Sequence, residues 1–203
     1  MTPLAAALKA LDLAPTLEKT LNEFQALFQR WNRKINLSAA RSEHELQSHI
    51  LDSLHIVPHL RAEAAAAGRT SPPARVLDVG AGGGLPAVIA AICLPETRIT
   101  ALEPVHKKHA FLRTAMRELE LANLEPHAER VDQHPHHDYD AAMSRATFDL
   151  REWLELGLGL VRPGGLVLGF EAIPRSDLPP DFQRHPYHLD DKSRAIVTLR
   201  RPV

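Results

Sequence analysis

The sequence predicts an α/β protein in which an N-terminal helical extension precedes a mostly parallel β-sheet. Three observations predict this class. In the first part, residues 1–71, apolar residues recur only at helical spacing. In the second part, residues 72–203, short β-branched runs alternate with helical stretches, as in chains whose parallel strands are joined by helices. The chain also ends in two strand-like runs with no helix between them, which favours an antiparallel last strand.

The first part contains two apolar stripes that each line one face of a helix. The first comprises Leu17, Leu21, Phe24, Leu27, Phe28 and Trp31, and the second comprises Leu46, Ile50, Leu51, Leu54 and Val57. We expect Pro58 to end the second helix, because proline cannot continue the backbone hydrogen bonding of a helix. The Pro- and Gly-rich stretch from Gly68 to Pro73 then separates the two parts.

The second part predicts strands and helices in alternation. The expected strands are 75–80, 98–103, 123–128, 140–144 and 165–170, followed by a terminal antiparallel hairpin of 182–189 and 194–201. The expected helices between the strands are 85–94, 105–121 and 150–160. Helical crossovers of this length imply a sheet that is covered on both faces.

Composition limits the class of protein. The 24 Lys and Arg residues balance 25 Asp and Glu residues, so the chain does not bind polyanions by bulk charge. A single cysteine, Cys93, forms no internal disulfide and offers no thiolate cluster for zinc, which fits a reducing compartment. The start of the chain lacks a basic leader, and no apolar run reaches the ~20 residues that span a bilayer. We therefore expect a cytoplasmic protein without membrane contact.

A glycine-rich turn follows the first expected strand. Asp78 precedes Gly80, Gly82, Gly83 and Gly84 at the carboxyl end of that strand, where ligands bind in doubly wound sheets. Glycine lets the backbone adopt positive φ and approach a ligand closely. Glu103 ends the next strand, and a carboxylate there can accept both hydroxyls of a ribose. The set predicts a pocket for a cofactor that carries adenosine.

The spacing of the turn distinguishes between cofactors. The third glycine of a dinucleotide site is replaced by Leu85, and no phosphate-binding G-x-x-x-x-G-K-[ST] motif exists. An acid such as Asp78 suits an ammonium group better than a phosphate, which favours S-adenosylmethionine. Two alternatives stay open at this point: a tight turn without a ligand, in which Asp78 caps the strand end, and a nicotinamide site.

Two residues after the third strand are candidates for binding adenine. The backbone N–H of Val131 and the carboxylate of Asp132 lie where they can meet the edge of the ring. The alternative is a loop aspartate that faces water.

The motifs together resemble the bacterial RsmG (GidB) family. The resemblance rests on VLDVGAGGGLPA, ALEP with KKHAFLR, ERVD and MSRA, preceded by WNRKINLSAAR and HILDSL, and it covers roughly residues 20–170. It implies a Rossmann-like class I S-adenosylmethionine-dependent methyltransferase sheet of seven strands, the last antiparallel. It also implies methyl transfer to guanine N7 of 16S ribosomal RNA. Cofactor-binding positions of the family match Gly80, Leu85, Val131, Asp132 and Arg145.

The sequence departs from the family pattern at three places. Ala87 replaces a glycine, and Glu103-Pro104 replaces Asp-Ser. The strand after Pro163-Gly164-Gly165 commonly ends in Leu-Lys-Gly, whereas this chain has Gly169-Phe170-Glu171. The missing lysine predicts altered positioning of the substrate.

Methylation at guanine N7 needs no general base, because N7 carries a lone pair and no proton. The enzyme has to align N7, the methyl carbon and sulfur, so catalysis is by orientation. No catalytic residue is assigned for this reason. Arg145, at the end of the fourth strand, is a candidate for positioning the cofactor or guanine O6. The alternative is a surface arginine paired with Asp149.

Two stretches concentrate positive charge without acids. They contain the expected RNA-binding residues Arg30, Arg33, Lys34 and Arg41 in the first stretch and Lys107 and Lys108 in the second. Sorted charge of this kind suits contacts with phosphates. Solvated helix faces are the alternative from composition alone, and the family resemblance favours RNA.

Other polar residues have plainer interpretations. Asn32, Asn36, Ser38 and Asp52 either cap helices or close over the substrate, and we favour capping together with hydrogen bonds between helices. The histidines between His134 and Asp138 lie in a proline-broken loop without a distant partner, so no metal site is expected.

The sequence leaves three competing functions. One is a methyltransferase for a small molecule or protein, which the acid-free WNRKINLSAAR segment disfavours. A second is a non-catalytic, S-adenosylmethionine-sensing factor that binds rRNA. A third is a nicotinamide oxidoreductase. The favoured partner is 16S rRNA, the small ribosomal subunit or its precursor, bound by a monomer.

Overall fold

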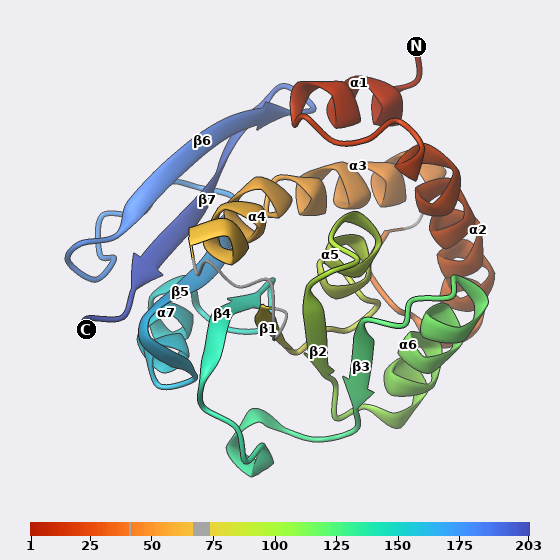
Figure 1. The fold of residues 1–203 in the computed structure, drawn as a ribbon. Helices are drawn as coiled ribbons and strands as arrows, with labels where there is room; N and C mark the ends of the chain where they lie inside the picture. Colours follow the sequence, from red (N-terminus) through yellow and green to blue (C-terminus); the bar gives the residue numbers. More distant parts are fainter. Residues whose placement is uncertain (41, 67–73) are drawn as a thin grey trace.

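The computed structural model describes residues 1–40, 42–66 and 74–203 (Figure 1). The helices are α1 (Pro3–Ala10), α2 (Leu17–Ile35), α3 (Glu43–Leu54), α4 (Val57–Ala66), α5 (Ala87–Cys93), α6 (His106–Glu118) and α7 (Leu150–Leu158), with a 3₁₀ turn η1 (Val131–Gln133). The strands are β1 (Arg75–Val79), β2 (Arg98–Leu102), β3 (Leu124–His127), β4 (Tyr139–Ser144), β5 (Val161–Glu171), β6 (Gln183–Leu189) and β7 (Lys192–Arg200).

The strands form one seven-stranded sheet in the order β3-β2-β1-β4-β5-β7-β6. The pairs from β3 to β5 are parallel, and β7 runs antiparallel to both β5 and β6. The predicted parallel sheet with a terminal hairpin is therefore confirmed. The direction of winding reverses between β1 and β4, and ligands bind at the carboxyl ends of strands at such a reversal.

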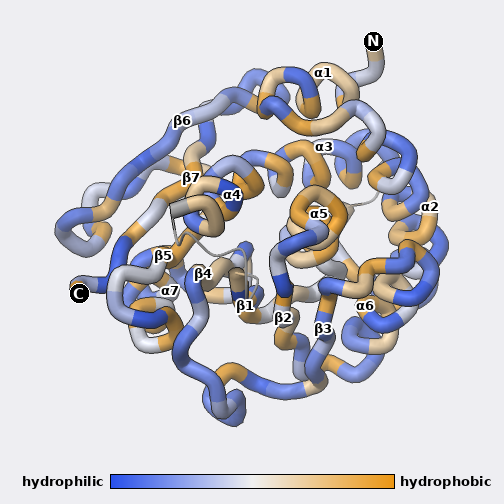
Figure 2. The backbone as a smooth tube through the Cα atoms, in the orientation of Figure 1, coloured by the Kyte–Doolittle hydropathy of each residue, from blue (hydrophilic) through white to orange (hydrophobic). Residues whose placement is uncertain are grey.

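The alternation of side chains along each strand divides the core into two layers. Val76, Ile99, Ala141 and Met143 face α1–α6, whereas Leu77, Val79, Ala142 and Val167 face α7. Figure 1 shows α3, α4 and α5 gathered on the first side of the sheet. Helix α5 is buried at every residue and is hydrophobic along its length in Figure 2, because it lies between the sheet and helices α2 and α3.

The N-terminal helices share a core with the sheet. Phe24, Phe28 and Phe111 join α2 to α6 through ring contacts with centroids 5.5–6.3 Å apart. Helices α3 and α4 also meet the terminal hairpin, where Glu63 pairs with Arg200 at 2.8 Å. The predicted boundary at residues 71 and 72 lies outside the described residues.

One local expectation needs correction. Pro58 does not end a helix: α3 ends at Leu54, and Pro58 is the second residue of α4, where the missing N–H has no intrahelical partner to lose. Helix α1 carried no prediction, because it offers only one short stripe of Leu4 and Leu8. The connection from β3 to β4 contains η1 and no α-helix. Within the described residues, no helix is long and apolar enough to cross a bilayer.

Candidate functional site

The glycine loop lies at the carboxyl end of β1 and begins in the left-handed region of φ. Gly80 has φ of +75°, and a Cβ atom there would lie 2.4 Å from Oγ1 of Thr147. Gly82 has φ of +56°, and its hypothetical Cβ meets nothing closer than the Gly80 carbonyl oxygen at 3.8 Å. The loop therefore needs glycine for its path at Gly80 and leaves open space beside Gly82, as a backbone cradle for a ligand requires.

Asp78, just before this loop, is fully buried. Its Oδ2 accepts a hydrogen bond from the N–H of Ala87 at 3.0 Å, so it does cap the start of α5. Its Oδ1 is the buried side-chain oxygen for which the described residues supply no partner. Burial raises the pKa of Asp78 to about 7, and nearby Glu103 adds to the rise. A buried carboxylate oxygen without a donor fits a site that receives a cation.

Glu103 uses its carboxylate within the protein. Oε2 accepts from the Gly82 N–H and Oε1 accepts from the Val105 N–H, both at 2.8 Å. This carboxylate thereby holds the glycine loop against the end of β2. Each oxygen keeps a second lone pair, so the predicted contact with ribose hydroxyls stays a prediction.

A small apolar cavity of about 200 Å³ opens beside Gly80. Leu102, Pro104, Val131 and Phe148 are among the residues that line it, which gives it the surfaces that suit a flat ring. Asp132 does not line this cavity: its carboxylate is exposed and lies 3.0 Å from Nε of Arg130. The structure thus brings Val131 to the predicted site and turns Asp132 towards water.

A second cavity, of about 350 Å³, lies on the other side of the loop. Gly82, Leu85 and Arg145 line it together with His49 from α3 and Lys108 from α6. The predicted cofactor residues Gly80, Leu85, Val131 and Arg145 therefore border two adjoining cavities. Both cavities contact Gly80 and Thr147.

Arg145 is held in place by α3 and does not pair with Asp149, so the alternative of a surface ion pair is wrong. Nη2 of Arg145 lies 3.2 Å from Oδ2 of Asp52, and its side chain is only 15% exposed. Nη1 donates to Oγ of Ser53 at 3.2 Å. Burial lowers the pKa of Arg145, against the opposing effect of Asp52. Asp149 instead caps α7 and pairs with Arg175.

Asp52 joins three parts of the chain, whereas we expected it to cap a helix or to form a hydrogen bond between helices. Besides Arg145, its Oδ1 accepts from the hydroxyl of Tyr187 at 2.7 Å and from Nη1 of Arg194 at 3.0 Å. Tyr187 and Arg194 belong to the terminal hairpin, and sequence reasoning missed both. No local pattern marks them, because they lie more than 130 residues from Asp52.

A third cavity, of about 450 Å³, lies at the carboxyl ends of β4 and β5. Its lining includes the linked residues Asp52, Arg145, Tyr187 and Arg194, the aromatic residues Phe148, Trp153 and Phe170, and the charged residues Asp149, Glu171 and Arg175. Arg145 borders this cavity as well as the 350 Å³ cavity beside Gly82. The segment after β4 therefore separates the two cavities.

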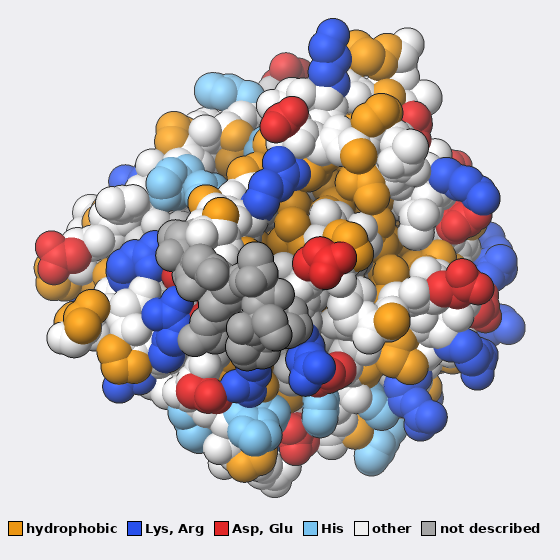
Figure 3. All heavy atoms as spheres, in the orientation of Figure 1, with side chains coloured by type: hydrophobic (Ala, Val, Ile, Leu, Met, Phe, Trp, Pro, Cys, Tyr) orange, Lys and Arg blue, Asp and Glu red, His pale blue; other side chains and the backbone are white. Residues whose placement is uncertain are grey.

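The predicted RNA-binding residues fall into three groups. Nη2 of Arg30 lies 3.1 Å from Oε2 of Glu118. No ion pair with a described residue is formed by Arg33, Lys34, Lys107 or Lys108. Arg41 lies outside the described residues. Figure 3 shows Lys and Arg side chains along the rim formed by α2 and α6, interspersed with Asp and Glu.

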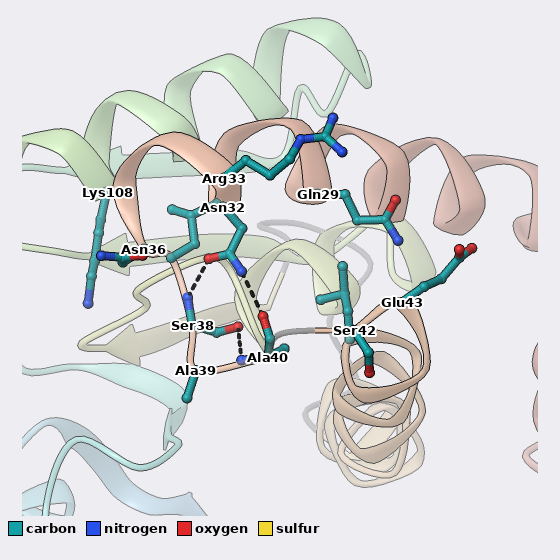
Figure 4. A pocket seen from close by; sticks show the side chains of 12 residues that line it. Gln29, Asn32, Arg33, Asn36, Ser38, Ala39, Ala40, Ser42, Glu43 and Lys108 are labelled. Atoms are coloured by element: carbon teal, nitrogen blue, oxygen red, sulfur yellow. Dashed lines mark hydrogen bonds between the residues drawn. The ribbon is translucent and has the colours of Figure 1, made fainter.

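Arg33 and Lys108 line a large open cavity of about 970 Å³ between α2 and the start of α3 (Figure 4). Asn32 shapes its wall, because its side chain accepts from Ser38 N at 3.0 Å and donates to the Ala40 carbonyl at 2.9 Å. Asn36 is the left-handed C-cap of α2. Asn36 thus has the expected capping role, whereas Asn32 holds the segment between α2 and α3 by hydrogen bonds.

The remaining candidates have structural roles. Cys93 is buried, and burial raises the pKa of its thiol to about 12. His134 is buried between the hydroxyl of Tyr139 at 2.7 Å and Glu129 at 2.6 Å. Across the described part of the chain, no group of three His, Cys, Asp or Glu residues is placed to hold a metal ion.

Comparisons with known proteins agree with this geometry. The family described as "rRNA small subunit methyltransferase G" (GidB) matches residues 17–177. A relative from Burkholderia cenocepacia named "Ribosomal RNA small subunit methyltransferase G" is 41% identical over 199 residues, which is 95% of this chain and 81% of the relative.

Two solved structures share the fold at lower identity. A methyltransferase from Geobacter sulfurreducens aligns with a TM-score of 0.62 at 16% identity, over 87% of this chain and 90% of its own. Cofactor-bound Rv0187 from MTB aligns with a TM-score of 0.60 at 17% identity, over 91% of both chains. The predicted Rossmann-like methyltransferase sheet is thereby confirmed. From residue 17 to residue 177, and through its relatives over most of its length, the chain belongs to the rRNA small subunit methyltransferase G family.

Proposed function

We propose that this protein transfers the methyl group of S-adenosylmethionine to N7 of a guanine in 16S rRNA. As a member of its family, it is an S-adenosylmethionine-dependent methyltransferase for the small-subunit rRNA. The observation that carries the finer proposal is the position of Arg145, which borders one cavity beside the glycine loop and another beyond β4. A methyl donor and an acceptor base need two such adjoining spaces.

Methyl transfer to N7 depends on the orientation of the two substrates and needs no acid–base group. The N7 lone pair attacks the methyl carbon, the carbon–sulfur bond breaks, and sulfur keeps the electron pair. No proton moves, so a site without a general base is adequate. Arg145 is cationic and fixed by Asp52, which lets it donate to a carbonyl oxygen such as guanine O6.

The residues at the end of β1 fit the cofactor. The open space beside Gly82 and the unpartnered oxygen of Asp78 suit an amino acid with an ammonium group. The apolar cavity beside Val131 suits the adenine ring. We assign Gly80, Leu85, Glu103 and Val131 to the cofactor, and Arg145 to the boundary between the cofactor and the guanine. The exposed Asp132 is assigned only if it turns inward on binding.

Cofactor binding is expected to weaken as pH falls below 7. The pKa of Asp78 is raised to about 7, so lower pH protonates it and removes the anion that would attract the ammonium group. A ligand that binds preferentially to the ionised form of Asp78 loses up to about tenfold in affinity for each pH unit below that pKa. Calorimetric titration of S-adenosylhomocysteine between pH 5.5 and 7.5 measures the effect.

Two controls isolate Asp78. The affinity of 5′-methylthioadenosine, which lacks the amino acid, should not change over the same range. Asp78→Asn should bind S-adenosylhomocysteine weakly and without pH dependence. Equal pH profiles for the two ligands would show that Asp78 does not face the ammonium group.

The start of α6 supports contact with RNA phosphates. Lys107 and Lys108 are the second and third residues of this helix, and its first turn contains no acid. Cations are unfavourable at a helix N-terminus, so helix stability does not account for them. Arg33 and Lys34 lie in the last turn of α2, where cations are favourable. The lysines of α6 are therefore the stronger sign of an anionic partner.

Four cations without an ion pair among the described residues set an expected salt dependence. If Arg33, Lys34, Lys107 and Lys108 each contact one phosphate, the affinity for single-stranded RNA should fall with a log–log salt slope of roughly −3. Lys107→Ala with Lys108→Ala should reduce the slope by about half. Lys19→Ala, on α2 but away from this stretch, is the control, and an unchanged slope in the double variant would exclude the surface.

The reaction itself is tested with small subunits from a bacterial strain that lacks its own enzyme of this family. Incubation with labelled S-adenosylmethionine should place the label in 7-methylguanosine of 16S rRNA, identified by mass spectrometry of nucleosides. Because such particles assemble in the cytoplasm, we infer that the protein acts there. Cofactor binding without transfer to either particles or naked rRNA would favour the non-catalytic alternative.

A further inference from the structure

The cavity of about 450 Å³ beyond β4 is separate from the two spaces assigned to the cofactor. Residues Arg145 to Phe148 form the partition, because Arg145 and Ala146 also line the 350 Å³ cavity and Phe148 also lines the 200 Å³ cavity. A molecule in the 450 Å³ cavity is therefore separated from the glycine-loop site only by this short segment. The volume of this cavity is of the size that holds a small ligand such as one nucleobase.

The walls of this cavity are aromatic on two sides. Phe170, at the end of β5, is half-buried and lies 5.6 Å from the guanidinium carbon of Arg145. Phe148 stacks on Trp153 with ring centroids 5.7 Å apart and an interplanar angle of 19°. Nucleobases stack on such rings once they leave a helix or loop.

The polar groups that line the cavity determine which kind of nucleobase it can bind. Arg145 offers N–H donors, and Asp52 fixes its guanidinium from the side. Tyr187 and Arg194 both donate to Oδ1 of Asp52, and Arg145 lies against Oδ2, so two arginines offset the negative charge of this carboxylate. Two further carboxylates of the lining, Asp149 and Glu171, are paired with Arg175 and Arg184. The N–H groups of Arg145 and the aromatic faces are therefore the part of the wall that suits the carbonyl edge of a purine.

The aromatic wall also suits the positive charge of the methylated base. Methyl transfer moves a positive charge from sulfur to the guanine ring, while the electron pair of the broken bond stays on sulfur. An aromatic face attracts a cation more strongly than a neutral ring. An aromatic wall is thus a surface that binds the developing charge better than the ground state.

We propose that this cavity receives the target guanine, with Phe170 as its aromatic wall and Arg145 as the donor to its carbonyl oxygen. This assignment rests on the proposed function and names the acceptor side of the same site. Phe170 is the discriminating residue, since it borders this cavity and neither of the two assigned to the cofactor.

Phe170→Leu tests the wall, because leucine keeps an apolar side chain but removes the aromatic face. We expect kcat/KM for small subunits to fall by about tenfold to hundredfold, the scale of one lost base–aromatic stack. Phe170→Trp should keep kcat/KM within a few fold. Affinity for S-adenosylhomocysteine should not change in either variant.

Phe182→Leu is the matched control. Phe182 is also partly buried and carries an arginine, Arg184, at 5.0 Å from its ring, but it lies outside the cavity. This variant should keep wild-type kcat/KM. An equal loss in both variants would mean that Phe170 serves only packing and would overturn the assignment.

A binding measurement separates this proposal from the reaction. With S-adenosylhomocysteine bound, 7-methylguanosine should bind more tightly than guanosine, and Phe170→Leu should remove the preference. If the wild-type protein methylates no rRNA, the proposed function fails. If it methylates rRNA while Phe170→Leu keeps full kcat/KM and the nucleoside preference, the function stands and the assignment of this cavity is wrong.

Discussion

Gly82→Asn is expected to remove cofactor binding while the protein stays folded. Gly82 has φ of +56° and lines the 350 Å³ cavity, where its hypothetical Cβ meets open space. Asparagine tolerates this left-handed conformation better than most residues, so we expect a cost of only about 1 kcal/mol in folding. A side chain in the cradle has to displace the ligand, and we expect affinity for S-adenosylhomocysteine to fall by about 100-fold or more, equal to roughly 3 kcal/mol.

Gly164→Asn provides the comparison. Gly164 also has positive φ, +75°, and its added Cβ would meet only ordinary contacts at 3.6 Å. It lies near the start of β5, away from the lining of the two cofactor cavities. Calorimetry and thermal melting of both variants check the prediction. A similar loss of affinity in both variants would indicate a general backbone effect and would show that Gly82 does not form part of a ligand cradle.

Asp52→Asn is expected to destabilise the fold and to reduce methylation together. Asp52 is 2% exposed, and it supplies the carboxylate for two largely buried arginines, Arg145 and Arg194. Removing one member of a buried ion pair costs about 3–5 kcal/mol, because the remaining charge stays without compensation. For a chain of this length, each kcal/mol lowers Tm by about 2–4 °C, so a fall of about 6–20 °C is expected.

The control for Asp52 is an exposed ion pair. Asp177→Asn breaks a contact with Arg175 at the surface, and its Tm should stay close to that of the wild type. Asp52→Asn combined with Arg145→Met should recover part of the lost stability without recovering activity, because one of the two unpaired cations is removed together with the donor. Full stability of Asp52→Asn alone would contradict the role given to this carboxylate.

The parallel sheet with its terminal hairpin and the position of the glycine loop could be predicted from local pattern. The strands 75–80 and 98–103 were identified by β-branched residues, and both match observed strands to within one residue. The glycine loop was identifiable because a sharp turn after a buried strand needs residues such as Gly80 that accept positive φ. Pro58 was misjudged, since the same residue that stops one helix also suits the first turn of the next.

The acceptor side could not be predicted in the same way. Asp52, Tyr187 and Arg194 meet only because α3 packs against the terminal hairpin. Each residue alone has an ordinary local interpretation, and Asp52 was accordingly expected to cap a helix or to form a hydrogen bond between helices. The distribution of charge along the sequence did not predict which cations are free of ion pairs. Arg30 belongs to an acid-free stretch of sequence, yet in the structure it pairs with Glu118 on α6.

By itself, the sequence determined the layered sheet, the terminal hairpin and the glycine loop with its acid, since these depend on the period of apolar residues and on backbone conformation over a few neighbours. Only the tertiary structure decided that Arg145 is buried against Asp52, that Asp132 faces water and that Phe170 lines a third cavity. The physical reason is the distance along the chain between the residues that interact. Local preference acts between adjacent residues, whereas ion pairs and cavities form between segments that the chain brings together after it folds.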